Sequence, residues 1–283
     1  TWYKNARLNR ITAWNNDPVQ DIPSEVIYFQ DLDNKKEWTV SQSPMMDDNE
    51  YYIKYGFGYA KYIHCTSSLI ADELRKHNYK ANLCVISNGF TPRLKKMAKN
   101  KIDDFFHITM TGRYTQEKRQ DLLIEAVRLS KYEKQIKLHI KGLGPREEEY
   151  KKLASKLTFG ADLGFVSDDE LARLYSYTDL YVHTSDVDIE SIATLEAISN
   201  GITPIISDSK TSATKQFALN DDCLFRAGDA KDLSKKINYF IENRDYLKEL
   251  SIKYESVAQK YDLSFCVDKM IDLYKEAIFD FKA

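Results

Sequence analysis

The chain has 283 residues, room for two ordinary domains or one large one, and its 43% hydrophobic and 30% charged residues are normal for a globular protein. Its formal net charge of −2 provides no overall basic field that would favour nucleic-acid binding. No apolar run approaches the roughly 18 residues that a membrane-spanning helix needs, and no secretory signal is recognisable, so a cytoplasmic protein is expected. The four cysteines form no CxxC pair, which supports neither a disulfide framework nor a zinc site.

The first fifty residues show little regular pattern. One stretch at residues 24–30, SEVIYFQ, is typical of a strand, and polar, turn-rich sequence surrounds it, above all at residues 41–49. From residue 51 the pattern sharpens, and it predicts a buried strand at 60–65, a helix that Ser67 or Ser68 caps and that runs through Lys76, and a strand at 82–87 that ends at the turn Asn88-Gly89. The basic stretch 95–101 that follows is expected to be a solvated linker.

From Phe105 onward, strands and helices alternate with short connections. Strands are predicted at 106–111, 136–140, 161–165, 180–183, 202–207 and 223–225. Helices are predicted at 120–130, from after Pro145 through Lys156, at 168–177, near 191–200, and at about 230–244 and 245–260. This alternation predicts an α/β fold with a doubly wound parallel sheet. Ligands of such a sheet bind beyond the C-terminal ends of its strands, where the loops 112–118, 142–145 and 185–191 fall.

Residues 186–209, DVDIESIATLEAISNGITPIISDS, form an acidic loop, a short helix and a buried strand in this pattern. The helix begins near Ser191, a good N-cap, and ends at the glycine signal Asn200-Gly201. It is apolar on nearly every side and should be largely buried, yet it contains Glu196. Because a buried carboxylate is costly unless it is paired or binds a polar group, the segment predicts a ligand site. The alternative is that Glu196 faces water.

The loops at the strand ends carry cations and glycines. Gly112-Arg113 follows a strand and Lys118 precedes the next helix, which suits a diphosphate through charge-assisted hydrogen bonds, although solvated surface cations are the alternative. Gly142 and Gly144 form a flexible loop but no GxGxxG fingerprint, so a dinucleotide site is disfavoured.

Other catalytic signals are weak or missing. His139 and His183 lie in or at the ends of strands and are expected to be satisfied core or rim histidines. The sequence contains no HExxH, GxSxG or GxxxxGK[ST] motif. Metalloproteases, serine hydrolases and P-loop NTPases are therefore disfavoured.

Several ordered segments resemble the donor-binding half of a GT-B glycosyltransferase of the large retaining family 4 type (glycosyl transferases group 1), which includes bacterial enzymes of cell-envelope glycan and glycolipid synthesis. These segments are TGRYTQEKRQDLLIEA, KGLGPREEEYKKLA, GFVSDDELARLYSYTDLYVHTS and DIESIATLEAISNGITPIIS, the last with two acids separated by seven residues. Upstream, IHCTSSLIADEL and VISNGF resemble the end of the family's N-terminal domain.

The resemblance implies a GT-B-like α/β fold with a complete C-terminal Rossmann-like sheet and a shortened N-terminal α/β part. The expected parts are a partial acceptor-side domain at 1–93, a linker at 94–104, a donor-binding domain at 105–262, and a helix at 263–283 that crosses back to the N-terminal part. Residues 1–50 contain no matching glycine-rich loop or histidine, which usually complete the catalytic region of the family. Either a truncated chain or a reduced N-terminal half is expected.

The resemblance also assigns roles to residues. Arg113 and Lys118 would hold the donor diphosphate and stabilise the charge that develops as the nucleotide leaves, with no metal or other cofactor required. Asp188 would contact the transferred hexose, and Glu196 would accept hydrogen bonds from the ribose hydroxyls. The remaining expected donor-binding residues are the loop glycines Gly112, Gly142 and Gly144, the base neighbours Phe165 and Val166, and Glu190, Ser191 and Ile192, whose backbone N–H groups lie at a helix N-terminus.

Two departures from the family pattern concern the acidic loop. The family usually has Glu where this chain has Asp188, and Glu190 lies two residues further on. The spacing to Glu196 fits Asp188, which is therefore favoured for the sugar contact. Ile189 and Ser191 stand where glycines are common, so the loop is expected to be less open.

The resemblance implies a retaining glycosyltransferase that moves a hexose from a nucleoside-diphosphate sugar, most simply UDP-hexose, to a glycan or lipid-linked acceptor. A non-catalytic module that binds a nucleotide sugar or a protein is the alternative, and a sugar phosphorylase is a weaker third reading because no lysine–cofactor motif is visible. A peripheral membrane contact through the basic residues 93–101 at the inner face of the membrane is a separate expectation. No nucleic-acid partner is expected.

Overall fold

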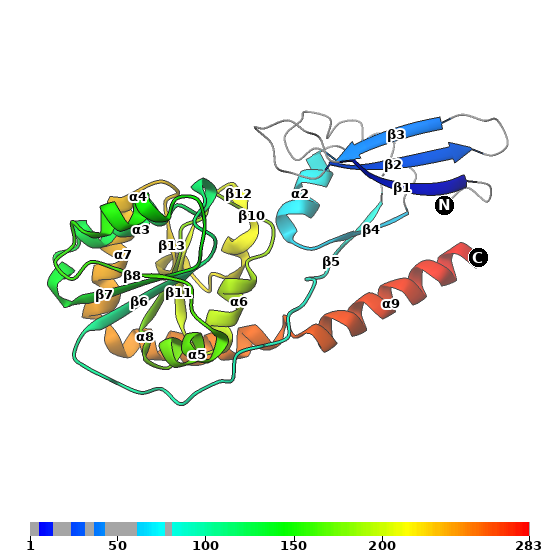
Figure 1. Ribbon diagram of the computed structural model, residues 1–283. Coiled ribbons are helices and arrows are strands. Elements are labelled where there is room, and N and C mark those ends of the chain that lie inside the picture. The colour runs from blue at the N-terminus through cyan, green and yellow to red at the C-terminus, as the bar shows by residue number, and fades with distance from the viewer. Residues whose placement is uncertain (1–5, 14–23, 32–36, 43–60, 77–80, 283) are drawn as a thin grey trace. The chain divides into compact units, whose positions relative to one another are not determined.

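The computed structural model describes residues 6–13, 24–31, 37–42, 61–76 and 81–282 (Figure 1). The chain divides into two units, Thr1–Ile63 with Glu73–Leu83, and His64–Asp72 with Cys84–Ala283. Most of the turn-rich stretch expected at 41–49 lies outside the described residues.

The first unit contains a three-stranded antiparallel sheet of order β1-β2-β3. Its strands are β1 (Ala6–Ala13), β2 (Ser24–Asp31) and β3 (Glu37–Gln42). The sequence predicted β2 but neither neighbour, because strand propensity depends on packing partners that a single polar stretch does not reveal. An antiparallel meander of this kind was not among the expected elements.

A strand–helix–strand segment follows, as predicted. It comprises β4 (Tyr62–Cys65), α2 (Ser68–Lys76) and β5 (Asn82–Val85), and β4 and β5 form a two-stranded sheet. The predicted ends differ from the observed ones by one or two residues, as expected for boundaries read from sequence.

The second unit is built on a six-stranded sheet of order β13-β11-β9-β6-β7-β8. Each neighbouring pair is parallel, which confirms the predicted doubly wound α/β fold. The strands are β6 (Phe106–Thr111), β7 (Ile136–Lys141), β8 (Asp162–Gly164), β9 (Leu180–His183), β11 (Thr203–Ser207) and β13 (Leu224–Phe225). Strands β6, β7, β9 and β11 are almost wholly buried, as strands covered on both faces must be, whereas the edge strand β8 is partly exposed.

Helices cover both faces of this sheet (Figure 1). Helix α3 packs against α4 and α7, whereas α6 packs against α8. The helices are α3 (Gln120–Leu129), α4 (Glu147–Ala154), α5 (Asp168–Tyr177), α6 (Ile192–Ser199), α7 (Ala230–Glu242), α8 (Arg244–Gln259) and α9 (Leu263–Lys282). All seven were predicted from the sequence within a few residues.

The order of strands places a switch point at the centre of the sheet. From β6 the chain moves outward through β7 and β8, and it then returns to β9 on the other side of β6. The connections that leave β6 and β9 therefore diverge to opposite sides. The C-terminal edge between β6 and β9 is where an open α/β sheet offers a ligand site.

Helix α6 lies in the core, as its apolar sequence predicted. Its residues Leu195, Ala197 and Ile198 are fully buried. Ser191 is the N-cap, and its hydroxyl accepts a hydrogen bond from the N–H of Thr194, which confirms the predicted start. The helix ends where Gly201 adopts a positive φ of 69°, a conformation that glycine enters without a Cβ penalty.

Candidate functional site

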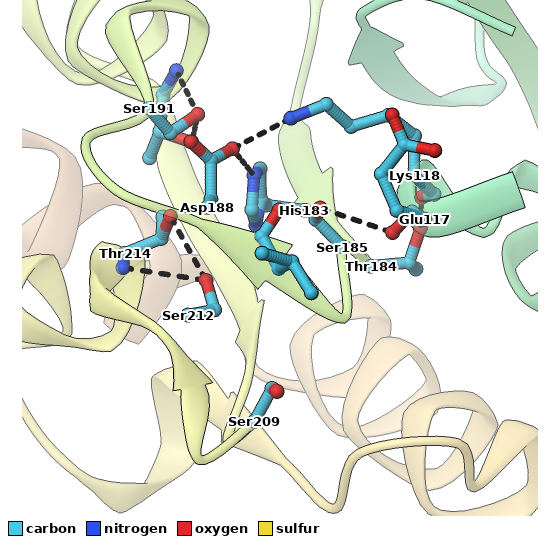
Figure 2. Close-up of polar contacts among 12 residues, drawn as sticks. Glu117, Lys118, His183, Thr184, Ser185, Asp188, Ser191, Ser209, Ser212 and Thr214 are labelled. Carbon is cyan, nitrogen blue, oxygen red and sulfur yellow. Dashed lines mark hydrogen bonds and ion pairs between the residues drawn. The ribbon is translucent and has the colours of Figure 1, made fainter. Parts of the chain in front are cut away.

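Three side chains meet at the switch point of the sheet. The Lys118 Nζ lies 2.8 Å from Oδ2 of Asp188, and the His183 Nε2 lies 3.1 Å from the same oxygen (Figure 2). Lys118 comes from the loop after β6, whereas His183 and Asp188 come from the end of β9 and the loop after it. The fold thus brings together two predicted site residues that are 70 positions apart in the chain.

Hydrogen bonds to the backbone hold the loop after β6 against the loop after β9. The Thr184 hydroxyl lies 2.7 Å from the carbonyl oxygen of Lys118 and 2.8 Å from that of Arg119. The Ser185 hydroxyl donates to the carbonyl of Glu117, as shown in Figure 2, and the N–H of residue 186 donates to the same carbonyl. Lys118 is therefore held opposite Asp188 by its own main chain.

The acidic loop is fixed from its other side by a second short pairing. Asp188 belongs to the two-residue strand β10 (Val187–Asp188), which pairs in parallel with β12 (Thr211–Ser212). The Ser209 hydroxyl donates to the carbonyl of Asp186 over 2.5 Å, which closes the same loop. A loop that is bonded along both edges positions its carboxylate more rigidly than a solvated loop would.

Arg119 joins the short 3-10 turn Gln116–Lys118 to α3 in an unusual backbone conformation. It has a φ of 54° and is the only non-glycine residue with a positive φ in the described part of the chain. Such a conformation is uncommon and persists where surrounding contacts hold it. Its guanidinium bonds Asp121 and, over 3.1 Å, Asp186.

The charges at the switch point are strongly coupled. Burial by itself would raise the pKa of Asp188, but the hydrogen bond from His183 and the contact with Lys118 outweigh it and lower this pKa to about 2. Burial lowers the pKa of His183, whose side chain is 3% exposed, against the opposing pull of Asp188. We therefore assign the neutral tautomer that carries its proton on Nε2 and donates it to Asp188.

The predicted glycines shape the neighbouring loops. A Cβ on Gly142, whose φ is 156°, would lie 1.9 Å from the carbonyl oxygen of Gly112, and one on Gly144 would lie 2.5 Å from that of Tyr114. The loops after β6 and β7 can therefore pack together only if residues 142 and 144 lack side chains. At Gly112 itself a Cβ would meet nothing within 4 Å, so its outer side is open.

The buried Tyr114 ties the same loops to the end of β8. Its hydroxyl donates to the carbonyl of Ile140 over 2.6 Å and accepts from the N–H of Gly164 over 2.8 Å. Phe165 follows directly and is 73% exposed, whereas Val166 is half-buried against the small core cluster beneath α5. An exposed phenylalanine at a strand end is available to a flat apolar ligand.

Arg113 does not join the contact between Lys118 and Asp188. Its side chain is 77% exposed, and its nearest carboxylate, that of Glu117, is 3.8 Å away. Both cations were expected to hold one diphosphate, and the structure fixes Lys118 while leaving Arg113 exposed.

Glu196 is buried and has a protein partner. Its side chain is 7% exposed, so the alternative that it faces water is wrong. The Arg93 guanidinium donates from Nε to Oε1 over 2.6 Å and from Nη2 to Oε2 over 3.4 Å, and it also contacts Asp168 at 3.2 Å. Arg93 was not among the predicted site residues, because no periodicity links positions 103 residues apart.

The remaining predicted residues lie at the start of α6. The Glu190 side chain accepts hydrogen bonds from the Ser87 hydroxyl and from the N–H of Asn88, both in the turn after β5. The N–H of Ile192, which was expected to face a ligand, donates to the carbonyl of Glu190 over 3.1 Å. The N–H groups of Ile192 and Thr194 are thus used in bonds within the start of the helix.

The two core histidines predicted from the sequence have different neighbours. His139 lies 3.0 Å from the ring nitrogen of His107 and 3.0 Å from Asp162, in a network away from the switch point. His183 is equally buried but bonds Asp188 directly. The expectation of satisfied histidines is confirmed for His139, whereas for His183 it missed the contact with the site.

The basic stretch 93–101 is largely paired within the protein. Besides Arg93, Lys96 bonds Glu255 at 2.8 Å, and Lys99 donates to the carbonyls of Tyr175 and Thr178. In the described residues no helix has the length and apolar character to cross a membrane. The same part of the chain contains no group of three or more His, Cys, Asp or Glu side chains suited to a metal ion.

Two parts of the chain match two different protein families. Residues 92–257 match the family model for glycosyl transferases group 1. Residues 1–73 match the supersandwich domain of glycosyl hydrolase 94. A 65-residue segment is 31% identical to the N,N'-diacetylchitobiose phosphorylase of Vibrio furnissii, a match that covers 22% of this chain and 8% of that protein.

Several solved structures resemble large parts of the chain. The catalytic domain of cholesterol-α-glucosyltransferase from Helicobacter pylori is 47% identical, with a TM-score of 0.54, and the match covers 55% of this chain and 98% of that one. HepE of Anabaena, solved in complex with UDP, is 18% identical with a TM-score of 0.70, over 80% of this chain and 67% of that one. With more than half of its residues matched by the family model, the chain belongs to the glycosyl transferases group 1 family of glycosyltransferase enzymes, and its α/β fold with a six-stranded parallel sheet matches GT-B glycosyltransferase structures.

Proposed function

We propose that the chain is a retaining glycosyltransferase that moves a hexose from UDP-hexose to a glycan or lipid-linked acceptor in cell-envelope glycan or glycolipid synthesis. The contact of Lys118 and His183 with Asp188 at the switch point is the observation that carries this proposal. The similarity to a cholesterol-α-glucosyltransferase favours glucose as the hexose and a lipid as the acceptor. The similarity to HepE, solved with UDP and with UDP-glucose, adds support for the nucleotide through the fold alone.

Lys118 and Arg113 are the cations that bind the diphosphate. Each can donate charge-assisted hydrogen bonds to phosphate oxygens, and their charge stabilises the leaving nucleotide as the glycosidic bond breaks. Lys118 is already fixed by the backbone bonds of its loop, so little reorganisation is needed at that position. This electrostatic role requires no metal ion, and full activity in EDTA is the expected result.

Asp188 is the residue that contacts the hexose. Its low pKa of about 2 keeps it ionised at neutral pH, so it accepts hydrogen bonds from sugar hydroxyls. The neutral His183 holds this carboxylate in place and contributes no second charge. Lys118 and Asp188 lie side by side, so they can bind the two sides of the bond between phosphate and sugar. Lys118 contacts the phosphate, and Asp188 contacts the sugar.

The other donor contacts follow the shape of the loops. Glu196 accepts hydrogen bonds from the ribose hydroxyls, and Phe165 and Val166 border the base. Gly112 offers open backbone to the diphosphate, while Gly142 and Gly144 keep the adjoining loop close. Ser191 caps α6, and the N–H groups at its start that bond neither Glu190 nor Ser191 face the phosphate or the sugar.

A transfer assay tests the proposal. The purified chain is incubated with UDP-glucose, GDP-glucose or ADP-glucose and a sterol or glycolipid acceptor, and the anomeric configuration of the product is read by NMR. We expect transfer from UDP-glucose with retention, strongly reduced in Lys118→Ala and Arg113→Ala. Full donor affinity and transfer in both variants would contradict the proposed site.

The cellular location and the membrane contact are separate parts of this proposal. We place the chain in the cytoplasm, in peripheral contact with the inner face of the membrane through residues 93–101. Co-sedimentation with anionic vesicles that weakens with salt is the expected behaviour. No co-sedimentation at any salt concentration would remove the membrane contact and leave the transferase activity unaffected.

A second candidate is a non-catalytic module that binds a nucleotide sugar or a partner protein. It is favoured by the match of residues 1–73 to a domain of another family, where an acceptor-side domain was expected. Tight binding of UDP without transfer or donor hydrolysis would support this candidate. Turnover by the chain would exclude it.

A further inference from the structure

The carboxylate of Glu196 is held by a residue outside the sheet and its helices. Arg93 lies in the irregular segment between β5 and β6, and its Nε and Nη2 reach the two carboxylate oxygens over 2.6 and 3.4 Å. Its third nitrogen, Nη1, lies 3.2 Å from Asp168 in the first turn of α5. One guanidinium therefore bridges α5 and α6.

The neighbouring residue fixes Arg93 in this place. Leu94 is 5% exposed and packs in a small cluster with Leu171 and Tyr175 of α5 and Ala197 of α6. Since Ala197 directly follows Glu196, the anchor and the ion pair act on the same turn of α6. The Arg93 side chain nevertheless remains 57% exposed, so its outer side is accessible to a ligand.

The ion pair with Arg93 leaves the Glu196 carboxylate able to accept further hydrogen bonds. An ionised carboxylate has about four acceptor positions on its two oxygens, and Arg93 occupies one on each. The two positions that remain match a vicinal diol, whose two hydroxyls can each donate to one oxygen. The guanidinium has no acceptor and so cannot compete for these hydroxyl protons.

We propose that Arg93 is a positioning residue of the donor site, which orients the Glu196 carboxylate so that it can accept hydrogen bonds from both ribose hydroxyls of the nucleotide sugar. This inference rests on the proposed function, in which Glu196 binds the ribose. It adds a residue from the segment before β6 to a site otherwise built from the loops of the sheet. Without Arg93, a buried carboxylate in an apolar helix would lose its compensating charge.

The proposal is tested by changing Arg93 in the protein and the 2'-hydroxyl in the nucleotide, separately and together, as in a double-mutant cycle. Affinities of UDP and 2'-deoxy-UDP are measured by titration calorimetry for the wild-type chain, Arg93→Met, Arg93→Lys and Asp168→Asn. In the wild type, loss of the 2'-hydroxyl should weaken binding by about tenfold or more, as for a hydrogen bond to a charged group. In Arg93→Met, UDP should bind at least about tenfold more weakly, and the penalty for 2'-deoxy-UDP should shrink to about threefold or less.

The two other variants separate positioning from folding. Asp168→Asn removes one contact of Arg93 but keeps its bonds to Glu196, so UDP affinity should stay within about threefold of wild type. Arg93→Lys keeps the charge but loses the two-pronged geometry, and it should bind UDP with intermediate affinity. If Arg93→Met does not fold, as judged by circular dichroism, the lysine variant carries the same comparison.

The outcomes distinguish this inference from the proposed function. UDP binding as tight as wild type in the Arg93 variants, or an unchanged penalty for 2'-deoxy-UDP, would overturn the role of Arg93 while leaving the donor site intact. No binding of UDP to the wild-type chain would overturn the proposed function and this inference with it. A smaller penalty in both Arg93 variants, with Asp168→Asn unaffected, would establish the positioning role.

Discussion

The two acids associated with helix α6 are neutralised in different ways. Asp188, before the helix, is bonded by Lys118 and His183, whose side chains are 20% and 3% exposed. Glu196, within the helix, is bonded by Arg93, which is 57% exposed and comes from an irregular segment. Both carboxylates are nearly buried, at 12% and 7% exposure, so the difference lies in their partners.

This difference separates a preformed end of the site from an adjustable one. The partners of Asp188 are fixed by the sheet and by backbone bonds between two loops, so its geometry should change little when a ligand binds. The partner of Glu196 is a long, half-exposed side chain that can change rotamer, although its neighbour Leu94 is anchored in the core. We therefore expect substitutions at the Asp188 end to affect turnover and substitutions at the Glu196 end to affect affinity.

The largest effect is expected at the preformed end. Asp188→Asn keeps the size of the side chain and removes its charge, and it should lower kcat by on the order of a hundredfold, as for other groups that act on the transition state. Steady-state transfer from UDP-glucose measures this. Asp208→Asn, at a carboxylate that is 55% exposed, is the control and should retain full activity. More than a third of wild-type kcat in Asp188→Asn would contradict a turnover role.

Removal of the buried histidine should mainly cost stability. His183→Ala leaves a cavity and an Asp188 without one of its bonds, and it should lower the free energy of unfolding by about 2 kcal/mol. His183→Gln can still offer an N–H near the position of Nε2, so it should lose less than about 1 kcal/mol. Urea denaturation compares the variants. Equal losses would show that the histidine acts by packing alone.

The same histidine predicts a pH dependence. Its pKa is lowered in the folded state, so below its ordinary value of about 6.5 the unfolded chain binds more protons and stability falls with pH, by at most about 1.4 kcal/mol per pH unit. The loss ends once the pH drops below the folded-state pKa. The difference in unfolding free energy between wild type and His183→Gln, measured from pH 7.5 to 5, isolates this contribution, because the other histidines are shared. A constant difference would argue against a neutral His183.

The smallest effect is expected at Glu190. Its side chain bonds Ser87 and Asn88 and is not part of the contact between Lys118 and Asp188. Glu190→Gln retains an acceptor for the serine hydroxyl, so kcat should stay within about threefold of wild type and the unfolding free energy within about 1 kcal/mol. A loss of activity as large as that of Asp188→Asn would transfer the sugar contact to Glu190 and reverse the assignment.

The sequence pattern predicted the sheet, six of its helices and a buried Glu196 because each depends on neighbours in the chain, whereas α9 and the role of Asp188 followed from the resemblance to the family. Strand and helix periodicity follows from neighbours in the chain, and a charge in an apolar helix is visible in a single segment. The partners of these acids were not predictable in the same way. Arg93 lies 103 positions before Glu196, and nothing in the basic stretch around it marks one cation as buried against a helix.

The bonds between loops were missed for a related reason. Thr184 and Ser185 bond backbone carbonyls 65 to 68 positions away, and any short polar residue after a strand has the same local appearance. The left-handed conformation of Arg119 was equally hidden, because non-glycine residues adopt it only where tertiary contacts require it. Positions of loops thus depend on contacts that appear only once the chain is folded.

The extended side chain of Arg113 has a consequence for how fast a ligand arrives. Because Lys118 is already paired with Asp188, it contributes little net field at the edge of the sheet, whereas the guanidinium of Arg113 is 77% exposed. An approaching diphosphate should therefore be drawn first to Arg113, an attraction that salt screens over about 8–10 Å at physiological ionic strength. In stopped-flow measurements, added salt should slow UDP association with the wild-type chain more than with Arg113→Gln. An equal salt dependence would place the electrostatic steering elsewhere on the surface.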